Sequence, residues 1–136
     1  MIQVMPNLHF KSNCKQAIEL YKRAYGAEVK VLLRYAEADP QDFIMDDDKH
    51  GDLVYHSEIV IGSHRLMLND TTEDDFMVGN SSSLLLHFDI EDECKEAYRI
   101  MSEGAVIISS MESQTYCACF ASLIDKYGVR WDLMAG

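Results

Sequence analysis

The chain has 136 residues, 48% of them hydrophobic, which is enough for one domain whose core needs no disulfide framework. Its formal net charge of −11, with 23 acidic and 12 basic residues, argues against nucleic-acid and membrane partners, because phosphate-rich surfaces bind clusters of Lys and Arg. There is no apolar run of membrane-spanning length and no recognisable secretory leader, so we expect a cytoplasmic protein.

One unit of sequence occurs twice in the chain. Leu8-His9-Phe10 recurs as Leu86-His87-Phe88, and Gly26-Ala27 recurs as Gly104-Ala105, each 78 positions later (86 − 8 and 104 − 26). Between these markers, each copy has apolar residues at the i, i+3, i+4 and i+7 spacing of an amphipathic helix. They are Cys14, Ala17, Ile18 and Tyr21 in the first copy and Cys94, Ala97, Tyr98 and Met101 in the second.

The first half is predicted to contain one strand, one helix and three further strands. The strands are expected over residues 2–10, 29–35, 54–61 and 64–69. Asn13 and Gln16 predict a capping box at the start of the helix, and Gly26 predicts its end. Residues 36–52 have no sustained period and predict a long exposed loop, and Gly62-Ser63 predicts a hairpin turn.

The second half repeats this order after a polar linker over residues 71–82. Strands are expected over 84–88, near 106–111, over 116–123 and over 129–134. The helix between the first two strands begins with Glu91, Asp92 and Glu93, whose charges suit the positive end of the helix dipole. We therefore predict an α+β fold of two tandem βαβββ modules, residues 1–70 and 83–136, within a single domain.

The four cysteines are not expected to form a disulfide framework. Cys14 and Cys94 fall on the apolar faces of the two helices, where a free thiol behaves as a small hydrophobic side chain. Cys117 and Cys119 alternate on a predicted strand, and a lone C-x-C pair is a weak indication of a metal site.

The doubled strand-helix-three-strand pattern resembles the vicinal oxygen chelate superfamily, which includes glyoxalase I, extradiol dioxygenases and bleomycin-resistance proteins. Local motifs resemble its PhnB-like branch: Pro-Asn-Leu-His-Phe at 6–10, His-Ser-Glu at 56–58, and Asp-Lys-Tyr-Gly-Val at 125–129 followed by Trp131. The resemblance implies that each module forms a curved sheet of the glyoxalase/bleomycin-resistance type with its helix outside. It also implies that the concave faces enclose a small-molecule pocket and that the protein is a homodimer.

The metal enzymes of this superfamily take one ligand from the first strand and one from the last strand of each half. The corresponding positions here are Met5 (or Pro6, if the register slips by one), Met67, Ser83 and Asp132. Only Asp132 is a good ligand for a divalent ion, because a thioether is soft and a hydroxyl is a weak neutral donor. We therefore expect no metal and no other cofactor.

His9 and His87 are the candidate catalytic residues. If the Leu and Phe on either side of each histidine face the helix, strand alternation places both imidazoles on the opposite, concave side. A pair of imidazoles across a cavity suits an acid and a base that act on opposite faces of a carbonyl compound. The alternative is that each histidine is simply a polar residue in a hydrated cavity.

The predicted substrate-binding residues come from strands of both halves. His56 and Glu58 share one strand face, as do Arg130 and Asp132, and each pair either contacts a ligand or has a structural role. The full set is His56, Glu58, Met67, Tyr116, Arg130 and Asp132. Tyr116 stands where the family often has a tryptophan, and Met67 either lines an adaptable wall or fills a gap. Trp131 is predicted to be core.

Two functions fit these features. In the first, the protein is an enzyme that binds a small molecule and carries out proton transfer of the isomerase or lyase type through His9 and His87. In the second, it sequesters a drug or metabolite without converting it, as bleomycin-resistance proteins do. The charge of −11 favours a cationic ligand in the second case.

Overall fold

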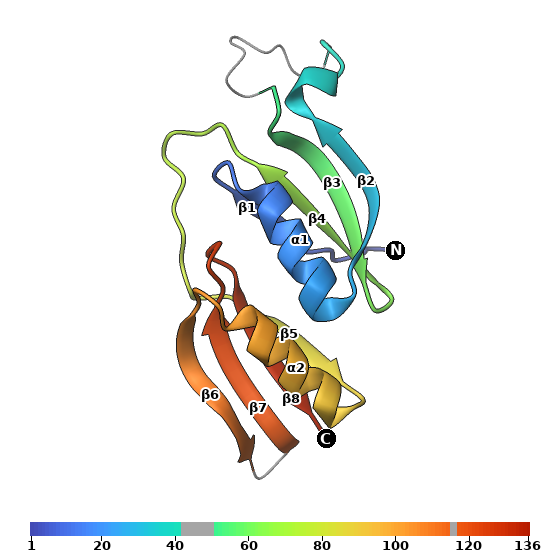
Figure 1. Ribbon diagram of the computed structural model, residues 1–136. Coiled ribbons are helices and arrows are strands. Elements are labelled where there is room, and N and C mark those ends of the chain that lie inside the picture. Colours follow the sequence, from blue (N-terminus) through green and yellow to red (C-terminus); the bar gives the residue numbers. More distant parts are fainter. Residues whose placement is uncertain (42–50, 115–116) are drawn as a thin grey trace. The chain divides into compact units, whose positions relative to one another are not determined.

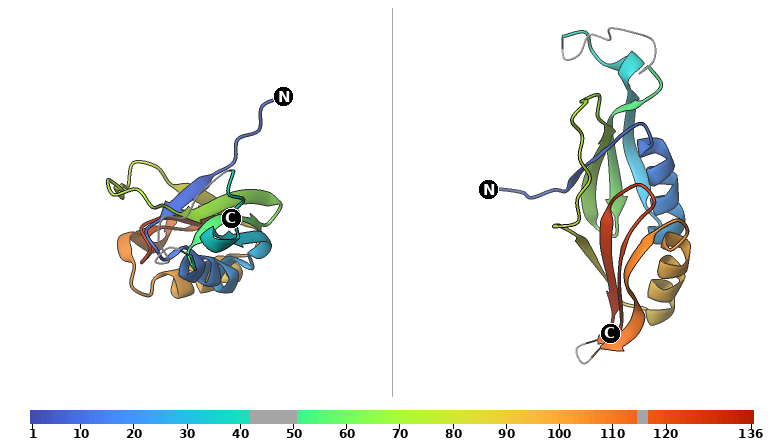
Figure 2. Two further views of the ribbon diagram at one scale, coloured as in Figure 1. Left: turned by 90° about the horizontal axis from the view of Figure 1, so that it is seen from above. Right: turned by 90° about the vertical axis from the view of Figure 1, so that its left-hand side faces the viewer.

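Each of two units of the chain contains one four-stranded sheet and one α-helix, as shown in the computed structural model (Figure 1). The structure describes residues 1–41, 51–114 and 117–136. The units are Met1–Phe76 and Met77–Gly136, so the division falls inside the predicted linker. Within each unit, the strands bend and the α-helix covers one face of the sheet (Figure 2).

The first unit has the predicted order of one strand, one helix and three strands. Its sheet has the order β1-β4-β3-β2, in which β1 runs parallel to β4 and the other pairs are antiparallel. Its elements are β1 (Asn7–Phe10), α1 (Cys14–Tyr25), β2 (Glu28–Arg34), the 3-10 helix η1 (Tyr35–Glu37), β3 (Val54–Ile61) and β4 (His64–Asp70).

The second unit repeats this topology with the order β5-β8-β7-β6 and a parallel pair formed by β5 and β8. Its elements are β5 (Leu84–Phe88), α2 (Glu91–Met101), β6 (Val106–Gln114), β7 (Cys117–Ile124) and β8 (Arg130–Ala135). The predicted α+β fold of two βαβββ modules is therefore confirmed.

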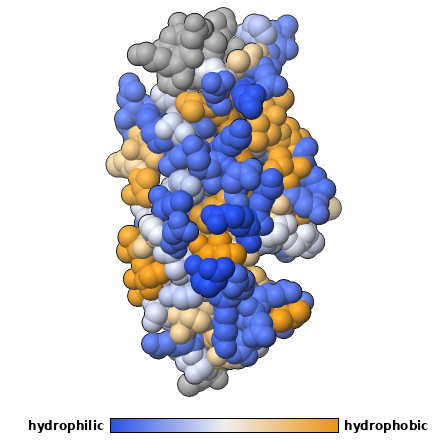
Figure 3. All heavy atoms as spheres, in the orientation of Figure 1, coloured by the Kyte–Doolittle hydropathy of each residue, from blue (hydrophilic) through white to orange (hydrophobic). Residues whose placement is uncertain are grey.

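The apolar helix stripes read from the sequence form the core between each helix and its sheet. Cys14, Ala17 and Tyr21 of α1 are fully buried, as are Cys94 of α2 and Trp131 of β8. Burying one large apolar side chain contributes about 1.5–3 kcal/mol to folding. The outer stripes of the helices carry charged residues, and the face drawn in Figure 3 is correspondingly hydrophilic over both helices.

The predicted strand over residues 2–10 is too long at its start. Its first pair in the register is Asn7 with Met67, and Pro6 contributes only a carbonyl that accepts the N–H of Met67 at 2.9 Å. Ile2 and Val4 are 90% and 93% exposed and precede the paired region. The 3-10 helix η1 (Tyr35–Glu37) overlaps the start of the predicted loop 36–52, and residues 42–50 lie outside the described part of the chain.

The start of α1 is capped differently from the prediction. Asn13 is at the N-cap position, but its side chain makes no capping hydrogen bond, so the predicted capping box with Gln16 is wrong. Asp70 at the end of β4 supplies the acceptor instead: its Oδ1 accepts the backbone N–H of Cys14 at 2.9 Å. Its Oδ2 accepts the backbone N–H of Val54 at 2.9 Å, so one buried carboxylate joins the helix start to β3.

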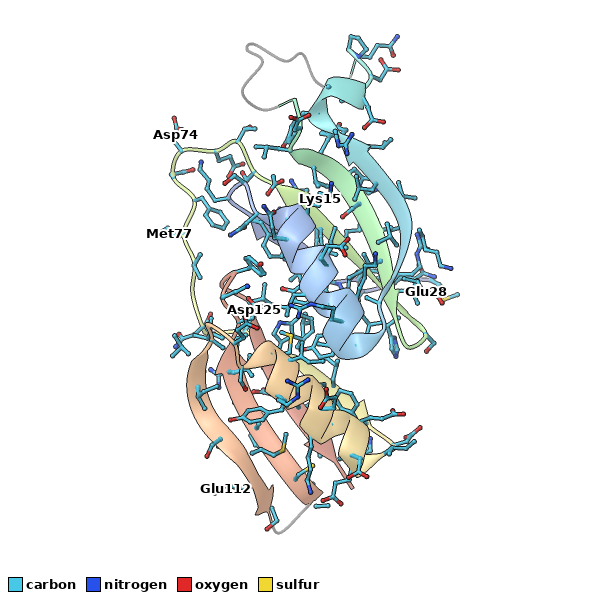
Figure 4. All side chains as sticks on the ribbon, viewed as in Figure 1. Lys15, Glu28, Asp74, Met77, Glu112 and Asp125 are labelled. Atoms are coloured by element: carbon cyan, nitrogen blue, oxygen red, sulfur yellow. The ribbon has the colours of Figure 1, made fainter. Side chains whose placement is uncertain are left out.

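Replacing Asp70 with Asn should destabilise the first unit. The amide puts an N–H donor where one of the two backbone donors now finds an acceptor, and leaving that donor unpaired costs about 2 kcal/mol. Urea unfolding followed by circular dichroism measures the loss. The matched control is Asp74→Asn on the exposed segment after β4 (Figure 4), which should leave the midpoint unchanged. Equal midpoints for D70N and wild type would contradict this role for Asp70.

Candidate functional site

Side chains on each sheet alternate between the face covered by the helix and the opposite face, called here the open face. In the first unit, Phe10 lies opposite Asp70 and both are buried, whereas the preceding pair, His9 and Asn69, points to the open face. In the second unit, His87 is exposed and lies opposite Met134. The neighbours of Met134 on β8, Leu133 and Ala135, are buried and point to the other face. Both histidines therefore lie on open faces, each within its own unit.

His9 is held by a side chain that sequence analysis did not identify. Its Nδ1 lies 2.5 Å from Oδ1 of Asn69, and Nδ2 of Asn69 donates to the carbonyl of Asp70 at 3.2 Å. Because the amide nitrogen is used by Asp70, the oxygen faces the imidazole, and Nδ1 of His9 must be the donor. This hydrogen bond leaves the lone pair on Nε2, which is the arrangement of an oriented general base.

His87 does not have the same environment. It occupies the position equivalent to His9, but the opposing residue in the register is Met134 where His9 has Asn69. A thioether is a weak acceptor and cannot fix an imidazole tautomer as an amide does. The sequence duplication thus places two histidines at equivalent positions but orients only His9 in this way.

Glu58 is paired across the sheet rather than along its own strand. His56 and Glu58 lie on the open face of β3, as predicted from alternation, and Glu58 lies opposite Met67 of β4. Arg65 donates from Nε to Oε1 of Glu58 at 2.5 Å, and a second guanidinium nitrogen also approaches this oxygen. The carboxylate is therefore neutralised by Arg65, and His56 and Met67 border a mixed polar surface.

A polar cluster lies on the open face of the second unit and consists of Ser83, Ser122, Arg130 and Asp132, called here the Arg130–Asp132 cluster. Ser83 donates its hydroxyl to Oδ2 of Asp132 at 2.6 Å, and Arg130 donates from Nη1 to the carbonyl of Asn80 at 2.9 Å. Ser122 lies opposite Asp132 in the register. The structure thus brings together two of the predicted residues, Arg130 and Asp132, with two hydroxyls that sequence analysis did not assign to binding.

Three polar atoms of this cluster are buried without a hydrogen-bond partner among the described residues. They are Oγ of Ser122, Nε of Arg130 and Oδ1 of Asp132. Nε and Oδ1 form an ion pair at 4.0 Å, a distance that is too long for a hydrogen bond. A buried polar group that stays unpaired costs about 1–3 kcal/mol, so these three atoms are favourably placed to bind a polar group.

Tyr116 lies outside the described residues. Asn69 and Ser122 were missed because nothing in their local sequence marks them as functional. Each gains its place from a strand partner distant in sequence, His9 for Asn69 and Asp132 for Ser122.

The positions that hold metal in the superfamily do not suit a divalent ion here. Met67 and Asp132 occupy equivalent places in the two registers, opposite Asn7 and Leu85. Asp132 already accepts from Ser83, and a thioether and a hydroxyl do not make up the hard donor set that a divalent ion requires. Among the described residues, no group of three or more His, Cys, Asp or Glu side chains is arranged to hold a metal.

All four cysteines are buried and free, and Cys14 and Cys94 lie on the buried helix faces as predicted. Burial and, to a smaller extent, the nearby Asp70 carboxylate raise the pKa of the Cys14 thiol from 9.0 to about 12. Burial likewise raises the pKa of the Cys94 thiol to about 12, with additional contributions from Cys119 and Cys117. Both thiols are therefore protonated at neutral pH and unsuited to nucleophilic chemistry.

Solved structures share this fold along nearly the whole chain. A protein from Pseudomonas aeruginosa is 22% identical with a TM-score of 0.84, covering 99% of this chain and 98% of its own. A PhnB protein from Bacillus cereus is 23% identical with a TM-score of 0.82, covering 99% and 100%. A glyoxylase/bleomycin resistance protein/dioxygenase domain from Frankia is 10% identical with a TM-score of 0.68, covering 100% and 98%. The resemblance drawn from the sequence is confirmed at the level of the fold.

Two other comparisons gave no match: neither a family model nor a curated protein matches this sequence. In the described part of the chain, neither helix has the length and apolar character needed to cross a membrane.

Ser57 and Ser122 should respond oppositely to replacement by Ala. Both are buried, but Ser57 donates to the carbonyl of Leu68 at 2.5 Å, whereas Oγ of Ser122 has no partner among the described residues. S57A should therefore lower the free energy of unfolding by about 1 kcal/mol, while S122A should leave it unchanged or raise it by up to about 1 kcal/mol. Urea unfolding measures both changes. A larger loss for S122A than for S57A would show that Ser122 is satisfied within the fold.

Cys14 and Cys94 should resist thiol reagents in the native protein. At pH 8 their raised pKa values leave almost no thiolate, whereas all four cysteines should react in denaturant. The same shifts predict a stability contribution that is complete below about pH 9 and is lost as the pH rises toward 12. Colorimetric thiol titration with mass spectrometry checks the first expectation, and urea unfolding across alkaline pH checks the second. Rapid native labelling of either cysteine would contradict both.

Proposed function

We propose that this protein, whose fold is that of the glyoxalase/bleomycin-resistance proteins, is a PhnB-like member of the vicinal oxygen chelate superfamily that binds a small molecule. In this proposal it transfers a proton to or from a carbonyl compound without a resident metal ion, in an isomerase- or lyase-type reaction. The likeness to a PhnB protein and to a glyoxylase/bleomycin resistance domain supports the assignment. A cytoplasmic location and a homodimeric state remain predictions.

The observation that carries the catalytic part is the His9–Asn69 pair. Asn69 orients the imidazole and keeps the proton on Nδ1, so that Nε2 can accept a proton from a bound substrate. Imidazole takes up and releases protons near neutral pH, which suits removal of a proton next to a carbonyl group. Asn69 acts through His9 and is a positioning residue.

His87 is proposed as the second acid or base, as the duplicated sequence predicts. Because Met134 lies opposite His87, its ring lacks an orienting amide of the kind that His9 has. We therefore place the main proton transfer at His9 and assign His87 the smaller share. The proposal that no metal is bound is based on the side chains at the two equivalent positions. In the second unit this side chain is the Asp132 carboxylate, which accepts a hydrogen bond from Ser83, and in the first unit it is the thioether of Met67.

Sequestration without turnover is the second candidate function, and the charge of −11 favours it for cationic ligands. It does not require an oriented imidazole. The two functions therefore differ in whether changes at His9 affect a chemical rate or only binding.

Exchange of carbon-bound hydrogen for deuterium tests the catalytic proposal. Wild-type protein in D2O should accelerate this exchange in at least one of hydroxyacetone, dihydroxyacetone and pyruvate, as followed by proton NMR. H9N should lower the rate by about 10²–10⁴-fold, N69A should lower it by a smaller factor, and H87N should have a weaker effect than H9N. H64N changes an exposed histidine of β4 and is the matched control.

Two further measurements separate the alternatives. Nitrogen-15 NMR should show His9 with its proton on Nδ1 in wild type and a mixture of tautomers in N69A, which a purely structural role for Asn69 would not produce. Binding of a carbonyl compound without exchange in any variant would favour sequestration. Exchange rates that are the same in wild type and H9N would refute the role of His9.

A further inference from the structure

We propose that the Arg130–Asp132 cluster binds the neutral polar end of a small molecule, a group that donates and accepts hydrogen bonds side by side, such as a primary carboxamide or a hydroxyl beside a carbonyl. The inference deepens the proposed function, on which it rests, by naming the class of ligand. It involves only residues of the second unit, on β7, β8 and the segment that leads into β5.

The hydrogen bond from Arg130 to the backbone of Asn80 determines which edge of the guanidinium can bind a ligand. Nη1 donates to the carbonyl of Asn80 at 2.9 Å, which holds the guanidinium in place. Nε is buried, forms an ion pair with Asp132 at 4.0 Å and has no hydrogen-bond partner among the described residues. An arginine fixed through Nη1 presents its Nε edge as a donor to an oxygen of a ligand.

Asp132 presents the complementary acceptor. Its Oδ2 accepts the hydroxyl of Ser83 at 2.6 Å, which orients the carboxylate and leaves Oδ1 buried without a hydrogen-bond partner in the described structure. Oδ1 lies 4.0 Å from Nε of Arg130. A donor and an acceptor at this separation match a group whose oxygen accepts from Nε and whose N–H or O–H donates to Oδ1.

Charge decides among the groups of this shape. A carboxylate ligand would be attracted by Arg130 but repelled by the Asp132 carboxylate. A cationic ligand would be attracted by Asp132 but repelled by Arg130. The net charge of −11 disfavours an anion further. A neutral group satisfies both side chains and leaves their mutual attraction in place.

Ser122 and its neighbours define the rest of the site. Ser122 is 2% exposed, lies opposite Asp132 and has an unpartnered Oγ, which can donate or accept. Apolar side chains surround the cluster on the same sheet face, as the register shows, so an apolar body attached to the polar group fits here. They are Leu85, Phe120, Ile124 and Met134.

Benzamide, benzoate and benzamidinium test the proposal because they have nearly the same shape and differ in charge and in hydrogen-bonding pattern. Titrations followed by nitrogen-15 NMR, including the Arg130 Nε–H signal, give the three dissociation constants. Wild-type protein should bind benzamide at least about tenfold more tightly than either ion, with shifts at Ser122, Arg130 and Asp132. Equal affinities, tighter binding of either ion, or no shifts at these residues would overturn the proposal.

Two substitutions should reverse the preference in opposite directions. Asp132→Asn leaves the arginine charge uncompensated and should make benzoate the preferred probe, whereas Arg130→Gln should make benzamidinium preferred. Arg99→Gln and Asp92→Asn on the exposed side of α2 are the matched charge controls and should keep the preference for benzamide. A preference that shifts equally in the controls would overturn the proposal.

Ser122→Ala keeps the test decisive if either charge variant fails to fold. It should keep the fold and weaken benzamide binding about fivefold or more, and unchanged binding would count against the site. The deuterium-exchange assay separates this inference from the proposed function. Exchange that depends on His9 without benzamide binding would refute only the inference. Benzamide binding with the predicted preference, but without exchange of any carbonyl compound, would refute only the proton transfer.

Discussion

A single buried carboxylate organises the first unit. Asp70 accepts the backbone N–H of Cys14 through one oxygen and that of Val54 through the other, and its own carbonyl accepts the hydroxyl of Tyr35 at 2.6 Å. These contacts join the start of α1, the start of β3 and the 3-10 helix to the end of β4. Because a buried carboxylate is costly unless its oxygens are hydrogen-bonded, the Asp70 side chain holds the starts of α1 and β3 at the end of β4, while its backbone carbonyl holds the 3-10 helix.

The second unit also contains a buried carboxylate whose oxygens accept hydrogen bonds, that of Asp125. Asp125, at the turn between β7 and β8 (Figure 4), accepts the backbone N–H groups of Tyr127 and Val129 through Oδ1. Its Oδ2 accepts the indole N–H of Trp131 at 2.9 Å, which positions the largest side chain of that core. Each unit therefore has a buried aspartate as an internal acceptor, although the two do not occupy equivalent positions.

The repeated scaffold carries different chemistry in its two copies. His9 lies opposite an amide and His87 opposite a thioether, while Met67 stands in the place that Asp132 has in the second unit. The open face of the first unit therefore carries the imidazole of His9, which Asn69 orients. The open face of the second unit carries the Arg130–Asp132 cluster. The two copies therefore differ in the polar groups on their open faces, whereas the features that they share serve packing.

Short-range patterns explain why so much of the fold was predictable. The duplication, the helical spacing of Cys14 to Tyr21 and the alternation along β3 are local signals, and the corresponding elements were found. The errors lie where a distant residue decides the outcome. The first strand begins only at Asn7, where its pairing with β4 starts, and Asp70 rather than Asn13 caps α1.

The sequence by itself determined the two βαβββ modules, their buried helix faces and the strand faces of His9, His87, Arg130 and Asp132. These follow from periods of 3.6 and 2 residues, which any segment expresses locally. Only the tertiary structure decided that Asn69 orients His9, that Arg65 neutralises Glu58 and that Ser122 lies beside Asp132. Pairing between strands distant in sequence sets those contacts, and strand register is fixed by the whole sheet rather than by any single segment.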